Sequence, residues 1–404
     1  MDRRLVPRPL AAHLASAMVL WSSSRTVLPI LKDALLPSSE AVERLRGLAA
    51  EIDAVGSNKV AAALDLEIAR RAKSYLDGLE AYRRHPYRRT DETPPVLWRE
   101  GTTRLLDYGG DTAGPMILVV PSLINRFYVL DLLPERSLLR HLAGRGLRPL
   151  VVDWGAPGRE ERKFDLTGYV AGRLESAFDT ALRAADAPIG IAGYCMGGLF
   201  ALALALRRPD DTACLALLAT PWDFHAERAQ PARFFGLIAD SLALLRDDEG
   251  ALPIEVIQSL FFMLDPFSAE RKFRHFAALD PNGDKARAFV ALEDWVNDGV
   301  PLTAAVAHDC ARSWYGENEP ARGQWQIGGR TVDPKRLRAP ALVVVPSRDR
   351  IVPPSSAEPL AAALEGATVL RPPLGHVGMM SAARAPAMLW TPIADWLRAR
   401  LNAR

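Results

Sequence analysis

Three side chains that could together carry out acyl transfer follow one another along the chain as cysteine, aspartate and histidine. The cysteine, Cys195, is the centre of Gly193-Tyr194-Cys195-Met196-Gly197, which follows the apolar run Ile189–Ala192 and precedes the small, helix-favouring run Gly198–Leu206. This pattern is typical of a nucleophile elbow, in which a strand turns sharply into a helix and the residue at the turn presents its side chain. The strand and the helix pack so closely there that glycine is favoured at the flanking positions. The helix dipole and a neighbouring imidazole would both favour the thiolate, which is the reactive form. We predict that Cys195 is a nucleophile; the alternative is a buried structural cysteine beside chance glycines.

A nucleophile on such a turn needs an acid and then a histidine later in the chain. Asp349 follows the apolar run Ala341–Val345, which places a carboxylate at the carboxyl end of a predicted strand. His376 lies in Leu374-Gly375-His376-Val377-Gly378, where flanking glycines let a loop present the imidazole. Alone, Asp349 could be a surface turn residue and His376 a loop histidine, but their order after the cysteine predicts a catalytic triad.

Two further sets of residues belong near this triad. The oxyanion of an acyl-transfer intermediate needs backbone N–H donors, and we expect them from Met196 and from the loop Val120–Asn125, with Leu123 as the candidate. Asp153 and Trp154 follow another predicted strand, Pro149–Asp153. They either face the site or simply pack within their loop.

Short apolar runs that alternate with helical patterns indicate a mostly parallel sheet with helices on both faces. The predicted strands are Met116–Val120, Pro149–Asp153, Ile189–Ala192, Cys214–Leu218 and Ala341–Val345. The fold class is therefore α/β, with the α/β-hydrolase arrangement that the elbow around Cys195 requires.

Two regions lie outside this pattern. Helical spacing from about residue 10 to 82, closed by a polar stretch over 88–95, predicts an N-terminal helical extension at 1–90 and a catalytic domain at 91–404. The interval of about 120 residues between the last two predicted strands is far longer than a crossover needs, and it predicts a helical cap insertion at about 222–335.

Composition excludes several classes of protein. The 404 residues carry 50 Lys and Arg against 48 Asp and Glu, so a net charge of +2 gives no long-range field for nucleic acid, although local basic patches could bind a phosphorylated ligand. Three scattered cysteines fit a reducing cytoplasm, and no spacing suggests a metal site. The sequence contains no run of 18 apolar residues, so we predict no transmembrane segment.

Taken together, the motifs resemble those of the polyhydroxyalkanoate synthases. The collinear matches, beyond the cysteine elbow, are Pro121-Ser-Leu-Ile-Asn-Arg-Phe-Tyr-Val-Leu-Asp-Leu132, Val152-Asp-Trp-Gly155, Ser347-Arg-Asp-Arg-Ile-Val-Pro353 and Gly375-His-Val-Gly-Met379. The resemblance implies a cytoplasmic enzyme that polymerises (R)-3-hydroxyacyl-CoA into polyester and releases coenzyme A. It further implies that Cys195 attacks the thioester, His376 accepts the proton, and Asp349 orients His376 or helps to activate the incoming hydroxyl.

The resemblance also implies what surrounds the site. It suggests no metal and no cofactor apart from coenzyme A as part of the substrate, and as partners a polyester granule surface and a second copy or partner subunit. Candidate substrate-binding residues are Asn125, Arg126, Asp153, Trp154 and Arg350, the last standing where family members often carry histidine. Two alternatives stay open: a hydrolase, either an intracellular depolymerase or an acyl-CoA thioesterase, and a non-catalytic granule-associated homologue.

Overall fold

The computed structural model describes residues 4, 6–27, 39–90, 93–110, 113–227, 233, 236–247 and 250–402. The chain divides into two compact units. One unit combines Arg89–Ile257 with Asp298–Arg404, and the other combines Met1–Arg88 with Gln258–Asn297.

The first unit is built on a sheet that has eight strands in the described part of the chain. Their order is β1 (Val96–Glu100), β2 (Thr103–Asp107), β6 (Arg148–Asp153), β3 (Met116–Val120), β7 (Ile189–Tyr194), β8 (Thr212–Leu218), β13 (Ala341–Val344) and β14 (Thr368–Leu370). β2 runs antiparallel to both of its neighbours, and all pairs from β6 to β14 are parallel. The central strands β3, β7, β8 and β13 are buried along their whole length, as their continuous apolar sequences predict.

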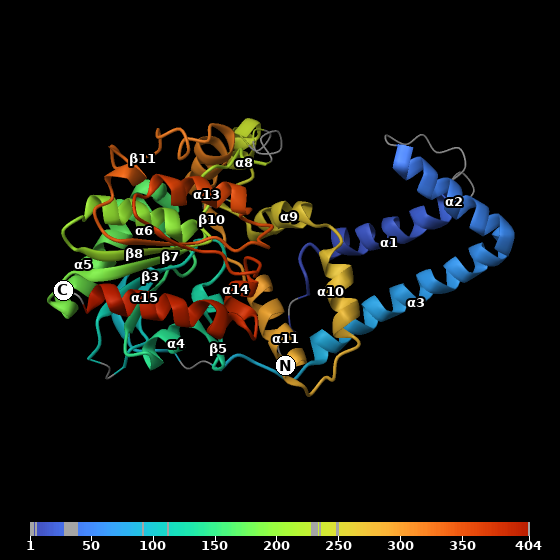
Figure 1. Ribbon diagram of the computed structural model, residues 1–404, viewed down its shortest axis with the longest axis horizontal. Coiled ribbons are helices and arrows are strands. Elements are labelled where there is room, and N and C mark those ends of the chain that lie inside the picture. Colours follow the sequence, from blue (N-terminus) through green and yellow to red (C-terminus); the bar gives the residue numbers. More distant parts are fainter. Residues whose placement is uncertain are drawn as a thin grey trace. The chain divides into compact units, whose positions relative to one another are not determined.

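Helices cover both faces of this sheet (Figure 1). They are α4 (Leu138–Gly144), α5 (Glu175–Ala185), α6 (Met196–Arg207), α13 (Pro354–Ala363) and α15 (Thr391–Leu401). Figure 1 shows α6 and α13 on one side of the strands and α4 and α15 on the other. The predicted α/β-hydrolase fold class is confirmed.

The chain between β8 and β13 is mostly helical, with two short strand pairs. It contains α8 (Ala239–Leu244), β9 (Ala251–Leu252), α9 (Ile254–Leu264), α10 (Ser268–Phe276), α11 (Asp284–Asn297), β10 (Leu302–Thr303), α12 (Ala304–Asp309), the π-helix η5 (Cys310–Gly316), β11 (Gln326–Ile327) and β12 (Arg330–Thr331). Part of this insertion, Gln258–Asn297, belongs to the second unit. The predicted limits at residue 90 and at about 222–335 stay predictions.

The second unit is helical. It contains α1 (Leu10–Val27), α2 (Ser39–Val55) and α3 (Ser57–Arg84) together with α10 and α11. Its core is largely aromatic, because Trp21, Tyr75 and Tyr82 pack with Phe273 and Phe276.

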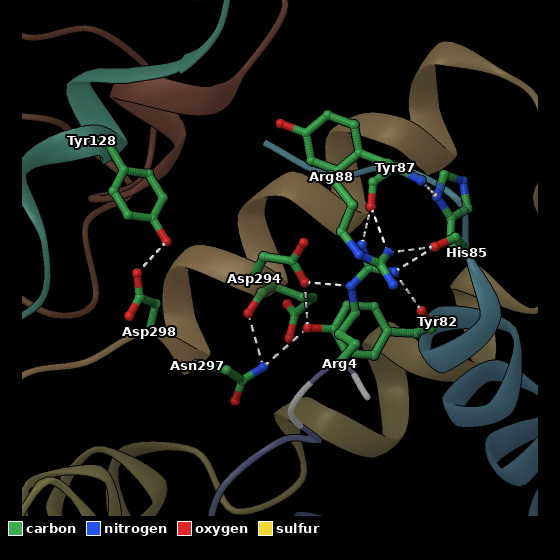
Figure 2. A network of polar contacts seen from close by, with 10 residues as sticks. Arg4, Tyr82, His85, Tyr87, Arg88, Tyr128, Asp294, Asn297 and Asp298 are labelled. Atoms are coloured by element: carbon green, nitrogen blue, oxygen red, sulfur yellow. Dashed lines mark hydrogen bonds and ion pairs between the residues drawn. The ribbon is translucent and has the colours of Figure 1, made fainter. Parts of the chain in front are cut away.

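Within this helical unit, Arg4 contacts both the end of α3 and α11. Its guanidinium donates to the carbonyl oxygens of Tyr82 (2.9 Å) and His85 (2.8 Å) and pairs with Asp294 at 2.6 Å (Figure 2). The last carbonyls of a helix have no partner within the helix, so this buried cation satisfies groups that would otherwise lack one. No helix in the described part of the chain combines the length and apolar composition needed to cross a bilayer.

Candidate active site

Cys195 lies at the turn between β7 and α6, as its motif predicts. Its φ of 56° is in the left-handed region that few non-glycine residues adopt, and the residue is partly buried. The Cys195 amide donates to the carbonyl of Leu218 at 2.8 Å, which ties the turn to the end of β8. Such a strained backbone conformation is typical of functional sites.

The glycines around Cys195 are required by close packing. A Cβ at Gly197 would lie 2.2 Å from the carbonyl oxygen of Val120, and one at Gly193 would lie 2.5 Å from the carbonyl oxygen of Gly197. Both distances are far inside van der Waals contact. The helix can therefore start directly beside the strand only because these side chains are absent.

Asp349 and His376 come together from two loops beyond the carboxyl ends of β13 and β14. His376 Nδ1 lies 2.7 Å from Asp349 Oδ2, and both residues are buried. The other carboxylate oxygen, Oδ1, accepts hydrogen bonds from the amides of Ile351 (2.8 Å) and Val352 (2.9 Å). The Asp349 carboxylate is therefore held from both sides, and its bond to Nδ1 leaves the other ring nitrogen, Nε2, available to a different partner.

The electrostatics of His376 connect it to Cys195. Burial, the largest influence, lowers the pKa of His376, but the charge of Cys195 and the hydrogen bonds to Asp349 and Cys195 raise that pKa to about 10. An imidazole with this pKa carries a proton at neutral pH and stabilises a neighbouring thiolate. The three residues of the predicted triad, Cys195, Asp349 and His376, thus lie close enough to influence one another.

Two tyrosines beside these residues were missed by the sequence analysis. The Tyr194 ring stacks on the His376 imidazole with centroids 5.1 Å apart, and its hydroxyl donates to the His376 carbonyl at 3.3 Å. Tyr194 directly precedes Cys195, so its place in the motif could have indicated this role. Tyr315 lies on η5 of the insertion, and desolvation, followed by the charges of Cys195 and Cys310, raises its pKa.

The predicted oxyanion donors are available. Within the described residues, neither the Met196 amide nor the Leu123 amide has a hydrogen-bond partner. Met196 is the first residue of α6, where helix geometry leaves the amide unpaired, and Leu123 lies in the loop after β3. Both residues are buried, which suits donors that act away from bulk water.

The predicted substrate-binding residues are not gathered in one place. Arg126 and Asp153 line one cavity of about 370 Å³. There Arg126 pairs with Asp298 at 3.3 Å, and Asp298 also accepts a hydrogen bond from Tyr128 (2.9 Å; Figure 2). Asp153 is buried and bonded to Arg104 at 3.0 Å.

The other three lie outside that cavity. Trp154 is buried in the core, where its indole N–H donates to the Pro121 carbonyl at 3.1 Å. Asn125 adopts a left-handed conformation with φ of 65°. Arg350 is an exposed neighbour of Asp349. Among the described residues, no group of three or more His, Cys, Asp or Glu side chains is arranged to hold a metal ion.

Comparisons with known proteins place this geometry in a family. The family model for the alpha/beta hydrolase fold matches residues 115–383. The poly(3-hydroxyalkanoate) polymerase subunit PhaC of Synechocystis sp. is 30% identical over 294 residues, covering 70% of this chain and 78% of that protein. The subunit of the same name from Haloferax mediterranei is 28% identical over 313 residues, covering 76% of this chain and 63% of that protein.

Among solved structures, the monoacylglycerol lipase of Paleococcus ferrophilus matches with a TM-score of 0.48 and 17% identity over 74% of this chain and 99% of that one. The eight-stranded sheet and its elbow, like the family model, define an α/β hydrolase. The chain belongs to this fold family and, within it, to the family of poly(3-hydroxyalkanoate) polymerase subunits PhaC. The resemblance found in the sequence motifs is confirmed.

Proposed function

We propose that this chain polymerises (R)-3-hydroxyacyl-CoA into polyester and releases coenzyme A, with Cys195 as the acyl carrier. The observation that carries the proposal is the contact of Cys195 with a His376 imidazole that Asp349 holds at 2.7 Å. Its relatives are named poly(3-hydroxyalkanoate) polymerase subunits, which supports this reaction over the alternatives.

The first half-reaction transfers the acyl group to sulfur. The Cys195 thiolate, paired with protonated His376, attacks the thioester carbonyl, and the amides of Met196 and Leu123 donate to the developing oxyanion. The bond to the coenzyme A sulfur then breaks, and His376 gives its proton to that leaving thiolate. The products are free coenzyme A and an acyl thioester on Cys195.

The second half-reaction makes the ester bond. His376, now neutral, accepts the proton of a hydroxyl from another 3-hydroxyacyl unit, and the oxygen attacks the acyl group on Cys195. The sulfur leaves as a thiolate, which restores its ion pair with His376. Because both oxygens of Asp349 are engaged, we assign this residue to orienting His376 rather than to activating the hydroxyl.

The choice of sulfur supports transfer rather than hydrolysis. An acyl group on cysteine is still a thioester, close in energy to the acyl-CoA, so it remains reactive toward a hydroxyl. A hydrolase does not need to keep its acyl group as a thioester, because water attacks an oxygen ester on serine equally well. The names of the relatives also argue against a non-catalytic homologue.

The partners follow from the same proposal. The substrate is an acyl-CoA, the product a polyester granule in the cytoplasm, and the word subunit in the names of the relatives suggests a second chain, either a copy or a different protein. No metal and no resident cofactor are needed, since the thioester already supplies the activation.

The test is the release of free thiol when purified protein meets (R)-3-hydroxybutyryl-CoA, with the acyl product identified by mass. We expect coenzyme A together with oligomeric ester, lost in Cys195→Ala and retained in the matched control Cys310→Ala. Release that yields only monomeric acid would assign a thioesterase instead. No release, with a second subunit supplied, would argue for a depolymerase or a silent homologue.

A further inference from the structure

A second cavity lies at the end of α6 that is remote from Cys195. Its volume is about 650 Å³, and it is lined by the last turn of α6, the hairpin β11–β12 and the segment that leads into β13. Ligand cavities in proteins measure roughly 300 to 1,000 Å³, so this volume is sufficient for a small molecule. We call it the basic cavity, after its four arginines Arg207, Arg330, Arg336 and Arg338.

The positive charge of the basic cavity is only partly balanced. None of its lining residues carries a carboxylate. Arg207 pairs with Glu175 at 3.0 Å, and Arg338 has a longer, solvent-exposed contact of 3.6 Å with Asp210. Because both partners of the Arg338–Asp210 pair are exposed, that ion pair contributes little to stability.

Arg330 and Arg336 have no hydrogen-bond or ion-pair partner for their side chains within the described residues. Two unpaired guanidinium groups beside a concave surface raise the local concentration of anions. The chain as a whole has a net charge of only +2, so this group of arginines is a local concentration of positive charge.

The backbone that carries these arginines is fixed by hydrogen bonds. Arg207 donates to the Ile327 carbonyl at 3.4 Å, and the Gly328 amide donates to Thr167 at 3.2 Å. Next along the chain, the Asp333 side chain accepts from the Lys335 amide at 3.1 Å. Gly328 and Gly329 both have positive φ, which the tight turn of the hairpin requires. A fixed backbone lowers the ordering cost of binding.

We propose that the basic cavity binds a small ligand that carries two or more linked phosphates. The planar guanidinium matches phosphate oxygens in pairs, and arginine is the residue best suited to this recognition. Linked phosphates offer more oxygen acceptors and more negative charge than a single phosphate does. Several arginines around one cavity therefore suit a diphosphate or triphosphate.

This site is separate from the proposed catalytic one. Cys195 precedes α6 and Arg207 ends it, and a helix of 12 residues is about 18 Å long. Binding in the basic cavity therefore does not require acyl-transfer activity, and its test is independent of the proposed function.

The experiment is a calorimetric titration of the purified full-length protein with inorganic triphosphate, and in parallel with inorganic phosphate. We expect saturable binding of triphosphate that the double variant Arg330→Ala, Arg336→Ala weakens by about tenfold or more, since two charged contacts are lost. Both arginines are exposed, so the variant should fold normally, which its unfolding midpoint would check. The matched control, Arg99→Ala with Arg398→Ala, removes the same charge from exposed positions elsewhere.

The proposal would be overturned by an absence of saturable binding to the unaltered protein, by equal weakening in the cavity variant and the control, or by equal affinity for phosphate and triphosphate. Equal weakening would mean general electrostatic attraction. Tighter binding of a DNA oligonucleotide than of triphosphate, lost in the same variant, would assign the surface to nucleic acid and would also contradict it.

Discussion

At the scale of single residues, the chemistry depends on how Asp349 and Cys195 set the state of His376. Burial alone would make this imidazole neutral, because an apolar environment disfavours its charged form. The two neighbours reverse that effect. The protonation of His376 therefore depends on both of these neighbours.

The first prediction concerns the orienting carboxylate. Asp349→Asn should lower turnover by on the order of 10³ to 10⁴, because the amide favours the wrong tautomer of His376 and cannot stabilise the imidazolium. Turnover is measured as coenzyme A release. Asp333→Asn, which changes a turn aspartate outside the site, should leave it within about twofold; an equal loss in both variants would contradict the role of Asp349.

The second prediction concerns pH. Burial lowers the pKa of His376, whereas Cys195 and Asp349 together raise it to about 10. Cys195→Ala should therefore lower that pKa, because Asp349 alone would then oppose the effect of burial. His376 in the unaltered protein should stay protonated as pH rises past 8 and lose its proton near 10. An NMR titration of the ring signals measures both values; unchanged behaviour in Cys195→Ala, with Cys310→Ala as the reference, would refute the ion pair.

At the scale of elements, the elbow depends on how closely β3, β7 and α6 pack. The turn places Cys195 at the start of a helix whose first ten residues are all buried. No loop adjustment can relieve a clash there, since both the strand and the helix are fixed by the core.

The third prediction tests this packing. Gly197→Ala should destabilise the fold by about 2 kcal/mol or more and abolish activity, because the new Cβ would lie 2.2 Å from the Val120 carbonyl oxygen. Urea unfolding gives the free energy. Gly172→Ala is the matched control, since its Cβ meets nothing within 4 Å, and it should be neutral or slightly stabilising. Similar losses in both would show that the elbow has room.

Much of the site was predictable at this scale because local signals coincide. Continuous apolar runs gave β3 without error, and β6, β7, β8 and β13 within two residues at either end. β1 was missed because it is half exposed and lacks such a run. Tyr315 could not be found, since only long-range packing brings the insertion to Cys195.

At the scale of the whole molecule, the grouping of Gln258–Asn297 with the N-terminal helices is the feature that the sequence did not reveal. Helical periodicity shows that α3, α10 and α11 each have an apolar face, but not which faces meet. Which faces pack together is decided by the shapes of the side chains and by specific polar contacts. Arg4, which contacts the end of α3 and Asp294 of α11, is the clearest of these (Figure 2).

The fourth prediction tests that contact. Arg4→Ala should cost the helical unit about 2 to 4 kcal/mol, because it leaves Asp294 and the last carbonyls of α3 without their cation, and the Arg4 side chain is only 4% exposed. Hydrogen exchange across residues 258–297 measures the loss within that unit. Arg25→Ala breaks an exposed pair with Asp65 and should cost less than about 1 kcal/mol. Equal effects would remove Arg4 from this role.

The central claim is that Cys195 carries the acyl chain, and the most direct test is to quench the reaction with (R)-3-hydroxybutyryl-CoA in acid and map the peptides by mass. The account predicts 3-hydroxybutyryl units, one or several joined by esters, attached as a thioester to the peptide that contains Cys195, and absent from His376→Ala. Coenzyme A release without any acyl group on that peptide, or acylation of Cys214 or Cys310 in its place, would contradict it.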